Sequence, residues 1–431
     1  MTDDPEPRSR SITVVLKTFL AEEAAGAVVL LVATVAALVW ANSSASEAYL
    51  RLWHAPLTIG AGPVSITADL QHWINDGAMT LFFFVAGLEM KRELVVGELS
   101  ERRTAVLPVA AALGGCVVPA VLFLAVTHGG AAARGWGIPM ATDIAFAVGV
   151  LALAGRGVPS GVRAMLLSVA IVDDIIAVVV IGIAFSTGLS WGWLLAALAG
   201  LGVVVLMRVV GVVSVAAYAA VGVFVWYTGF HSGVHATIFG AVLGLMTPAR
   251  PVEGRDVIGG LERTLHPVSA FLVVPLFALA NAGVDVRGGL LGQAFGSRVT
   301  WAVIVGFLVG KPLGVAAGAF AVRRLGVGAL PPGVAPRMVW GVGLLAGIGF
   351  TVALFVTDLS FGDPVLAGHA RIGILTASAA AAVLGVVAMR ALARGSTAPG
   401  TPAPTTPVGP TGSGPLTGTG GPPRGVGGTG V

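Results

Sequence analysis

The sequence MLLSVAIVDDIIAVVVIGIAF, residues 165–185, has the length and composition of a transmembrane helix, yet two adjacent acids, Asp173 and Asp174, lie near its centre. A charged side chain at the bilayer midplane disfavours insertion by roughly 2.5–3.5 kcal/mol, so such a pair persists only beside a partner, water or an ion. Neighbouring side chains on a helix point about 100° apart, so the two carboxylates face different surroundings. We therefore interpret the pair as a functional site rather than as polar groups that only hold helices together.

The composition is that of a polytopic membrane protein. Of 431 residues, 56% are hydrophobic and 11% are charged, and the mean hydropathy is +0.92. The basic residues behind the net charge of +4 lie in short loops, where they act as topology signals, so we predict no nucleic-acid partner. The single cysteine, Cys116, excludes an internal disulfide and a cysteine-based metal site, and we expect it to serve packing.

Apolar runs predict an all-α polytopic membrane protein with twelve transmembrane helices. They are residues 18–40, 73–90, 105–127, 135–154, 162–185, 191–209, 211–229, 232–247, 266–283, 299–320, 338–359 and 370–392. The even number places both termini on one side. Most Lys and Arg residues lie in loops on that side, which makes it cytoplasmic by the positive-inside rule.

This topology divides the chain into three parts. Residues 1–17 form a cytoplasmic N-terminal segment, which lacks the cleavage pattern of a signal peptide, and residues 18–394 form the transmembrane transporter domain. Residues 395–431 are Gly, Pro, Thr and Ser with one charge, a composition that cannot bury a core, so we expect a disordered cytoplasmic tail.

Two groups of three spans, within 105–185 and 299–392, have similar lengths and opposite orientations. Each middle span carries residues that weaken a helix. They are Gly137, Pro139 and Thr142-Asp143 in the first group and Gly347, Gly349 and Thr351 in the second. Interrupted spans at corresponding places in oppositely oriented halves are typical of transporters with a site at the membrane midplane. We predict two inverted-topology three-helix repeats with discontinuous helices 4 and 11.

The segment PLTIGAGPVSITAD, residues 56–69, contains two short alternating stretches around Gly60 to Pro63. This pattern predicts an extracytoplasmic β-hairpin between the first two spans. An isolated hairpin is marginally stable in water, so one hypothesis is a homodimer in which the hairpins of two subunits pair. A solvated loop is the alternative.

Two further charged residues lie inside predicted spans. Asp143 follows the expected break in the fourth span, where it either offsets the positive end of a half-helix as a cap or ligates an ion directly. Lys311 needs a carboxylate partner or must lose its proton, and Asp173 or Asp174 is the expected partner. Such a pair can release a proton in a useful pH range, or it can be a permanent structural salt bridge.

Titratable residues also lie at the edges of the spans. Asp76 and Glu89 bracket the second span, and Glu93 follows in the charged run at its cytoplasmic end, where such groups raise the local cation concentration or simply anchor the interface. His235 and Glu262 lie near other membrane edges. A histidine there can sense pH, although a neutral, satisfied histidine is the commoner case.

The chemistry of these residues favours a hard cation. Carboxylates with backbone oxygens suit sodium or lithium better than transition metals, and the sequence has neither a His/Cys cluster nor a phosphate-binding loop. Without a nucleotide or other cofactor, transport must use an ion gradient. If a proton and a cation compete for the same acids, the site carries one or the other, which is antiport.

The sequence resembles the NhaA family of bacterial sodium/proton antiporters, whose inverted repeats are a standard example of this architecture. The resemblance covers roughly residues 15–392 and depends on motifs in the family's order. They are WINDGAMTLFFFVAGLEMKREL, ATDIAFAVGVLAL, AIVDDIIAV, SGVHAT, LERTLHP, PLFALANAGV, GKPLG and GIGFTVALF. The tail after Arg394 has no counterpart in the family.

The resemblance implies roles for these residues. Asp174 would be the principal Na⁺ or Li⁺ ligand, and Asp173 would participate in binding while pairing with Lys311. Asp143 and Lys311, with Thr142 beside them, would compensate the dipoles where the two extended chains cross. Residues linked to pH response or ion entrance are Glu89, Glu93, His235, Glu262 and Asp76. The resemblance also implies electrogenic exchange activated at alkaline pH in the bacterial inner membrane, without enzymatic activity.

Three other functions fit the pattern less well. An organic-anion symporter would need a cationic or amide-rich pocket, and the predicted core offers only Lys311. An intramembrane aspartyl protease needs two acids from different helices that share a proton, whereas Asp173 and Asp174 point apart. A passive cation channel would not be expected to use a buried acid and lysine as a proton carrier.

Overall fold

The computed structural model describes residues 8–394, except 61, 63–64, 156, 187, 213 and 250–255, and it describes side chains from residue 25 onward. The predicted tail 395–431 and residues 1–7 lie outside this range. The first helix begins at Arg8, within the predicted N-terminal segment and ahead of the predicted span.

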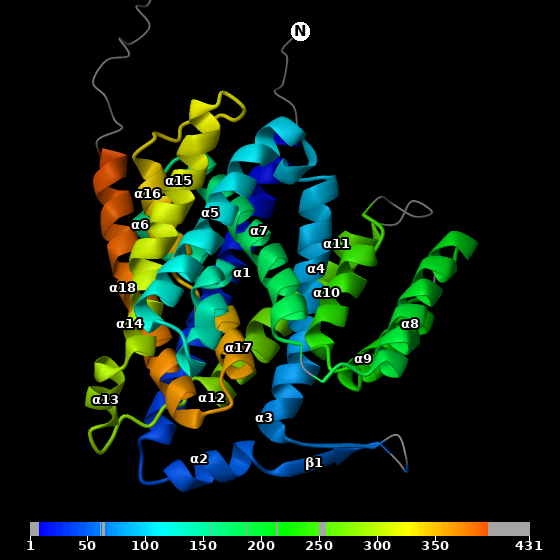
Figure 1. Ribbon diagram of the computed structural model, residues 1–431. Helices are drawn as coiled ribbons and strands as arrows, with labels where there is room; N and C mark the ends of the chain where they lie inside the picture. Colours follow the sequence, from blue (N-terminus) through cyan, green and yellow to red (C-terminus); the bar gives the residue numbers. More distant parts are fainter. Residues whose placement is uncertain are drawn as a thin grey trace, which may run out of the picture. The chain divides into compact units, whose positions relative to one another are not determined.

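The described residues are mostly helical (Figure 1). The α-helices are α1 (Arg8–Ala41), α2 (Ser46–Trp53), α3 (Leu70–His72), α4 (Met79–Val95), α5 (Arg102–Thr127), α6 (Ile144–Ala154), α7 (Ser160–Ala184), α8 (Trp191–Val210), α9 (Val215–Phe230), α10 (Ala236–Met246), α11 (Val257–Val268), α12 (Val274–Asn281), α13 (Leu290–Gly296), α14 (Arg298–Val305), α15 (Lys311–Arg324), α16 (Met338–Ala346), α17 (Phe350–Ser360) and α18 (Pro364–Arg394). The other elements are strands β1 (Pro56–Ile59) and β2 (Ile66–Asp69), the 3₁₀ segments η3 (Glu98–Ser100) and η4 (Ala131–Met140), and the π-helical segments η2 (Trp73–Ala78), η5 (Ser269–Val273) and η6 (Gly306–Gly310).

Many of these helices are long and apolar enough to cross a membrane, so the chain is a multi-pass membrane protein. Within the described residues six helices qualify by length and composition, or nine if each of three bent helix pairs counts as one span. The helices α9 and α10 are also apolar but shorter. The predicted number of twelve spans stays a prediction.

Two of the bent pairs occur where the sequence predicts discontinuous helices. The segment η4 and helix α6 meet at 51° across residues 141–143, and α16 and α17 meet at 48° across residues 347–349. The third pair, α1 and α2, is bent by 116°, so α2 turns across the end of the helix bundle near β1 (Figure 1).

The β-hairpin is confirmed as a two-stranded antiparallel sheet. Its register pairs Pro56 with Asp69 and Ile59 with Ile66. The indole N–H of Trp73 donates to the Leu57 carbonyl oxygen at 2.9 Å, which ties the hairpin to the start of η2. All four residues of β1 are exposed.

Close contacts at glycine residues join α5 to α15, the helix that begins with Lys311. A Cβ atom on Gly114 of α5 would collide with the Gly314 carbonyl oxygen of α15, and one on Gly318 would collide with the Ala110 carbonyl oxygen. Inside a bilayer, where lipid removes the hydrophobic drive between helices, such small residues let backbones approach and gain dispersion energy. This contact brings Lys311, at the start of α15, against Gly115.

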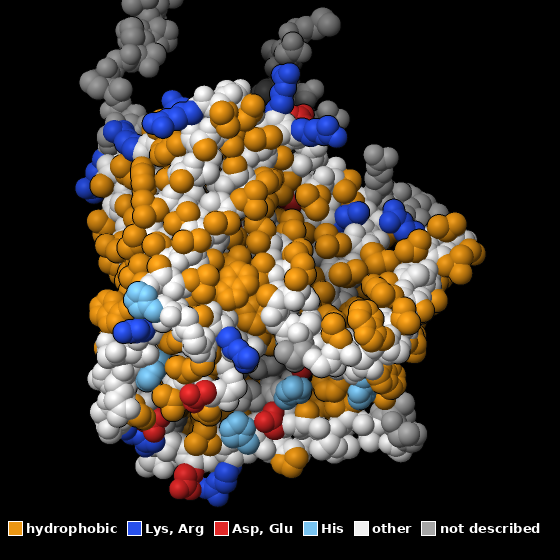
Figure 2. Space-filling model, viewed as in Figure 1, with side chains coloured by type: hydrophobic (Ala, Val, Ile, Leu, Met, Phe, Trp, Pro, Cys, Tyr) orange, Lys and Arg blue, Asp and Glu red, His pale blue; other side chains and the backbone are white. Residues whose placement is uncertain are grey.

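Charge is unevenly distributed between the two ends of the described residues. Helix α1 begins and α18 ends at the same end (Figure 1). In Figure 2 most Lys and Arg side chains gather at that end, a broad hydrophobic region follows, and acidic and histidine side chains lie toward the hairpin.

Candidate functional site

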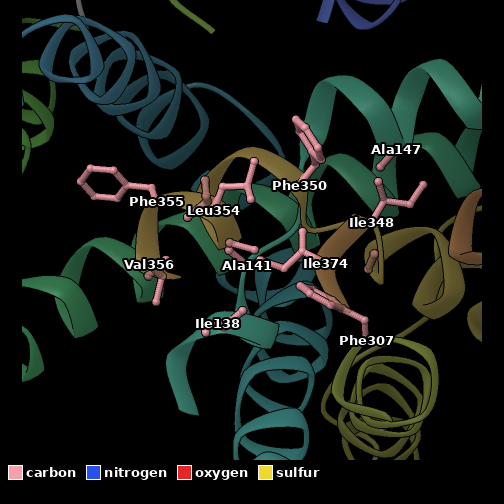
Figure 3. Close-up of a cluster of buried hydrophobic side chains, with 14 of the residues drawn as sticks. Ile138, Ala141, Ala147, Phe307, Ile348, Phe350, Leu354, Phe355, Val356 and Ile374 are labelled. Carbon is pink, nitrogen blue, oxygen red and sulfur yellow. The ribbon is translucent and has the colours of Figure 1, made fainter. Parts of the chain in front are cut away.

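The site is built where the two broken helices cross. The Asp143 backbone N–H donates to the Ile348 carbonyl oxygen at 2.6 Å, so the two extended segments are hydrogen-bonded to each other. Apolar side chains from both broken helices and from η6 surround the crossing (Figure 3). Those that the figure labels include Ile138, Ala141, Phe307, Ile348, Phe350 and Leu354.

Asp143 lies between the N-terminal ends of two half-helices. Its Oδ1 accepts from the Phe146 backbone N–H at 3.1 Å, which caps α6. Its Oδ2 accepts from the Thr351 backbone N–H at 3.1 Å and from the Thr351 hydroxyl at 2.7 Å, near the start of α17. One carboxylate therefore faces the partial positive charge of both helix ends.

The other two half-helices, η4 and α16, end at the breaks with carbonyl oxygens, which carry partial negative charge. A positively charged side chain and a hydroxyl group face these ends. The Lys311 ammonium donates to the carbonyl oxygen of Met140, the last residue of η4. The Thr142 hydroxyl contacts the carbonyl oxygen of Ala346, the last residue of α16, at 2.9 Å. Lys311 and Asp143 thus offset helix-end charges of opposite sign.

The structure pairs Lys311 with Asp173 rather than with Asp174. Lys311 Nζ lies 2.8 Å from Asp173 Oδ2, and both side chains are fully buried. The same oxygen lies 2.7 Å from the Thr142 hydroxyl. A single hydroxyl hydrogen serves either Asp173 or the Ala346 carbonyl oxygen, so these contacts compete.

Asp174 faces a different neighbourhood, as its position on the helix predicts. It lines a cavity of about 80 Å³ together with other polar residues, which are Thr142, Asp143, Thr351, Glu89, His266 and Ser269. Asp174 Oδ1 is buried and has no hydrogen-bond partner among the described residues. A buried carboxylate oxygen without a donor is suited to a proton or a metal cation.

The cavity extends away from the hairpin toward a charged cluster on α4 and α11. Glu89 Oε1 lies 3.8 Å from His266 Nε2. One turn further, the Arg92 guanidinium pairs with the Glu262 carboxylate. We call Glu89, Arg92, Glu262 and His266 the mouth cluster. It combines two acids, a histidine and an arginine from α4 and α11.

The remaining residues predicted for pH response do not line the cavity. Glu93 accepts the Glu98 backbone N–H at 2.9 Å and caps the turn after α4. His235 immediately precedes α10. Asp76 lies toward the hairpin, and its Oδ2 is 2.9 Å from Nε2 of His72, which precedes the predicted span. This hydrogen bond raises the pKa of His72 above 6.5.

On the hairpin side of the site, three aromatic rings fill the space between helices. Phe83 of α4 and Phe277 of α12 both pack against Phe355 of α17, with ring centroids 5.4 and 6.4 Å apart. At most 3% of each side chain is exposed.

A polar network lies beyond these rings. The side-chain amides of Asn75 and Asn281 donate to each other at 3.3 and 2.8 Å. Asn75 also donates to Asp358 at 3.1 Å, and Asp358 accepts from Arg371 at 2.6 Å. This network connects η2 and α12 to α17 and α18 on the side away from the cavity.

Sequence reasoning missed several of these contacts. Cys116, expected to serve packing, places its sulfur 3.4 Å from Asp173 Oδ1. Thr351, expected only to weaken a helix, is a hydrogen-bond donor to Asp143. The amides Asn75 and Asn281 received no role, although polar side chains inside predicted apolar spans were a usable signal.

Comparison with known proteins shows the family of the chain. The family described as Na⁺/H⁺ antiporter 1 matches residues 17–389. The Na⁺/H⁺ antiporter NhaA 2 of Pseudomonas putida is 45% identical over an alignment of 414 positions, which covers 86% of this chain and 91% of that protein. The Na⁺/H⁺ antiporter NhaA of Cupriavidus necator is 42% identical over an alignment of 429 positions, which covers 88% of this chain and 90% of that protein. These are transporters rather than enzymes, and with matches of this extent the chain belongs to the NhaA family of Na⁺/H⁺ antiporters.

Proposed function

We propose that this chain is a secondary active, electrogenic, pH-regulated antiporter that expels Na⁺ or Li⁺ in exchange for H⁺. The cation and the protons compete for Asp173 and Asp174. The observation that supports this proposal most directly is the buried Asp174 Oδ1, which lines the cavity and has no hydrogen-bond partner among the described residues. Such an oxygen gains from binding either a proton or a cation, so arrival of one displaces the other.

Asp173 and Lys311 supply a second proton-linked pair. Asp173 Oδ2 lies 2.8 Å from Lys311 Nζ. A cation bound to Asp174 attracts the neighbouring Asp173 carboxylate and so draws that carboxylate away from Lys311. An ammonium that loses its counter-charge in a buried place is driven to release its proton. Two proton acceptors beside one cation site support the exchange of more than one proton per cation, which makes transport electrogenic.

The mouth cluster offers a means of pH regulation. Glu89 and Glu262 attract cations toward the cavity, whereas Arg92 and a protonated His266 oppose them. A histidine loses its positive charge as the pH rises, and this would make the cluster more negative. We propose that this change favours entry of Na⁺ as the pH rises.

The distribution of charge supports an orientation. Lys and Arg gather at the end where α1 begins and α18 ends (Figures 1 and 2), so this end is cytoplasmic and the hairpin is extracytoplasmic. We propose the inner membrane of a bacterium as the location. The exposed β1 strand of the hairpin is an edge to which the same hairpin of a second subunit can pair.

Transport is tested with inverted membrane vesicles in which a dye reports ΔpH. Addition of Na⁺ or Li⁺ should dequench the dye with wild-type protein and leave it unchanged with Asp174→Asn. Asp285→Asn is a matched control, because Asp285 is exposed in a loop and pairs with Arg287. Full activity of Asp174→Asn contradicts the proposal, and movement of ²²Na⁺ without any change in ΔpH indicates a channel instead.

A further inference from the structure

The two oxygens of the Asp173 carboxylate have different partners. Oδ2 faces Lys311 Nζ at 2.8 Å and the Thr142 hydroxyl at 2.7 Å. Oδ1 faces the thiol of Cys116, with 3.4 Å between sulfur and oxygen. Asp173 is fully buried and Cys116 is 1% exposed, so bulk water does not replace the thiol at this position.

Helix α5 places the thiol there for a physical reason. Gly114 and Gly115 face α15 at close contact, and the next residue, Cys116, points toward α7 and the end of η4. Its packing neighbours are apolar, with Ala120 and Met140 nearest among the buried residues. The thiol has two acceptors in reach, the Asp173 carboxylate and the Met140 carbonyl oxygen at 3.7 Å, and the carboxylate is both nearer and charged.

We propose that Cys116 is a positioning residue for Asp173. Its S–H donates to Oδ1 and so holds the rotamer in which Oδ2 reaches Lys311 and Thr142. The charged groups that act on this thiol come from two helices packed against α5: Asp173 and Asp174 from α7, and Lys311 from α15. The inference rests on the proposed function in one respect, namely that Asp173 takes part in Na⁺/H⁺ exchange.

Transport should reveal this role through its dependence on Na⁺ concentration. In Cys116→Ala the carboxylate loses its donor and is held less firmly toward Lys311 and Thr142, so the site binds Na⁺ less well. We expect the apparent KM for Na⁺ at a fixed pH to rise roughly two- to fivefold, the factor expected for one weak S–H···O bond. The maximal rate should change less than the apparent KM. Cys116→Ser keeps a donor and should return the apparent KM toward wild type.

A control separates positioning from packing. Leu107→Val removes one methylene from a buried position of the same helix and leaves Asp173 untouched. It should lower thermal stability without changing the apparent KM for Na⁺. If Cys116→Ala also changes stability alone, with the apparent KM at its wild-type value, the thiol only fills space and the proposal is wrong.

The infrared S–H stretching band gives a direct readout, because Cys116 is the only cysteine in the chain. A hydrogen-bonded thiol absorbs at lower frequency than a free one, so the wild-type band should move to higher frequency in Asp173→Leu, a variant of similar size whose side chain has no acceptor. A band that stays in place shows that the thiol does not donate to Asp173 and overturns the proposal. This measurement needs no transport, so a wild type without exchange activity would refute the proposed function while the band still decides the contact.

Discussion

At the scale of single residues, the site depends on matching a buried charge with an opposite one. Lys311 and Asp173 are both fully buried, and each is the other's counter-charge. Removing one partner of a buried pair costs about 3–5 kcal/mol, because the charge left behind has neither water nor a partner. We expect Lys311→Gln to lower the melting temperature in detergent, and to do so more at high pH, where Asp173 cannot neutralise itself by binding a proton.

The double variant Lys311→Gln/Asp173→Asn is the matched control. Two amides leave no uncompensated charge, so most of the lost stability should return. The single variant should also change the pH profile of transport. Equal melting temperatures for the single and double variants would show that the uncompensated Asp173 carboxylate costs no stability, which contradicts this prediction.

His72 gives a second residue-scale prediction, with a definite sign. Its hydrogen bond to Asp76 raises the pKa of His72 above 6.5, so the contact stabilises the folded state below pH 6.5 and this gain is lost as pH rises through the folded-state pKa. Because 52% of the His72 side chain is exposed, the gain is about 0.5 kcal/mol or less. The melting temperature of His72→Gln should fall below wild type at about pH 5 and match it at about pH 9. A difference that grows with pH contradicts this assignment.

At the scale of elements, the crossing of the broken helices leaves no room for a side chain at position 349. A Cβ atom on Gly349 would collide with the Phe307 ring and lie 2.6 Å from the Ala141 carbonyl oxygen. We predict that Gly349→Ala destabilises the protein by about 1–3 kcal/mol, the usual effect of overpacking. Gly368→Ala is the control, because a Cβ there in α18 meets nothing within 4 Å. Comparable melting temperatures for both variants would contradict the crossing as described.

The breaks were predictable, but their detail was not. Gly137, Pro139 and Gly347 weaken a helix wherever they lie, so the sequence locates both interruptions. It does not show that η4 becomes a 3₁₀ helix, nor that a π-helical turn ends directly before Lys311. A π-turn adds one residue to a helical turn and so rotates the rest of the helix about its axis, and it forms in response to neighbouring helices.

The same limit applies to the partners of the acids. Helical geometry predicts that Asp173 and Asp174 face different neighbours, but it does not show which helix lies on each side. The structure assigns Lys311, Thr142 and Cys116 to Asp173 and the cavity to Asp174. The packing of α5 against both α7 and α15 brings these partners to Asp173.

At the scale of the whole molecule, the described residues are open on one side of the site and closed on the other. The cavity joins Asp174 to Glu89 and His266 at the end rich in basic residues. Toward the hairpin, Phe355 and its aromatic neighbours fill the space, followed by the hydrogen-bonded ion pair of Asp358 and Arg371. The cavity at Asp174 therefore extends toward the mouth cluster, whereas the packed rings lie on its hairpin side.

The hairpin gives a prediction about assembly. Replacement of residues 56–67 by a short Gly/Ser linker removes the exposed edge of β1 and should convert a dimer in detergent to a monomer, as measured by light scattering. Thr58→Ala is a milder control, since it removes only the hydroxyl contact with Thr67 at 2.8 Å within the hairpin. An unchanged oligomer size after the replacement excludes a decisive role for the hairpin.

Competition between cation and proton at Asp174 is tested most directly by calorimetry of Na⁺ binding to the detergent-solubilised protein. Titrations in two buffers of different ionisation enthalpy give the number of protons released per Na⁺ bound. We predict release of at least one proton by the wild type at mildly alkaline pH, and neither tight binding nor proton release by Asp174→Asn. Sodium binding by the wild type without proton release, or undiminished release by the variant, would contradict the proposed mechanism.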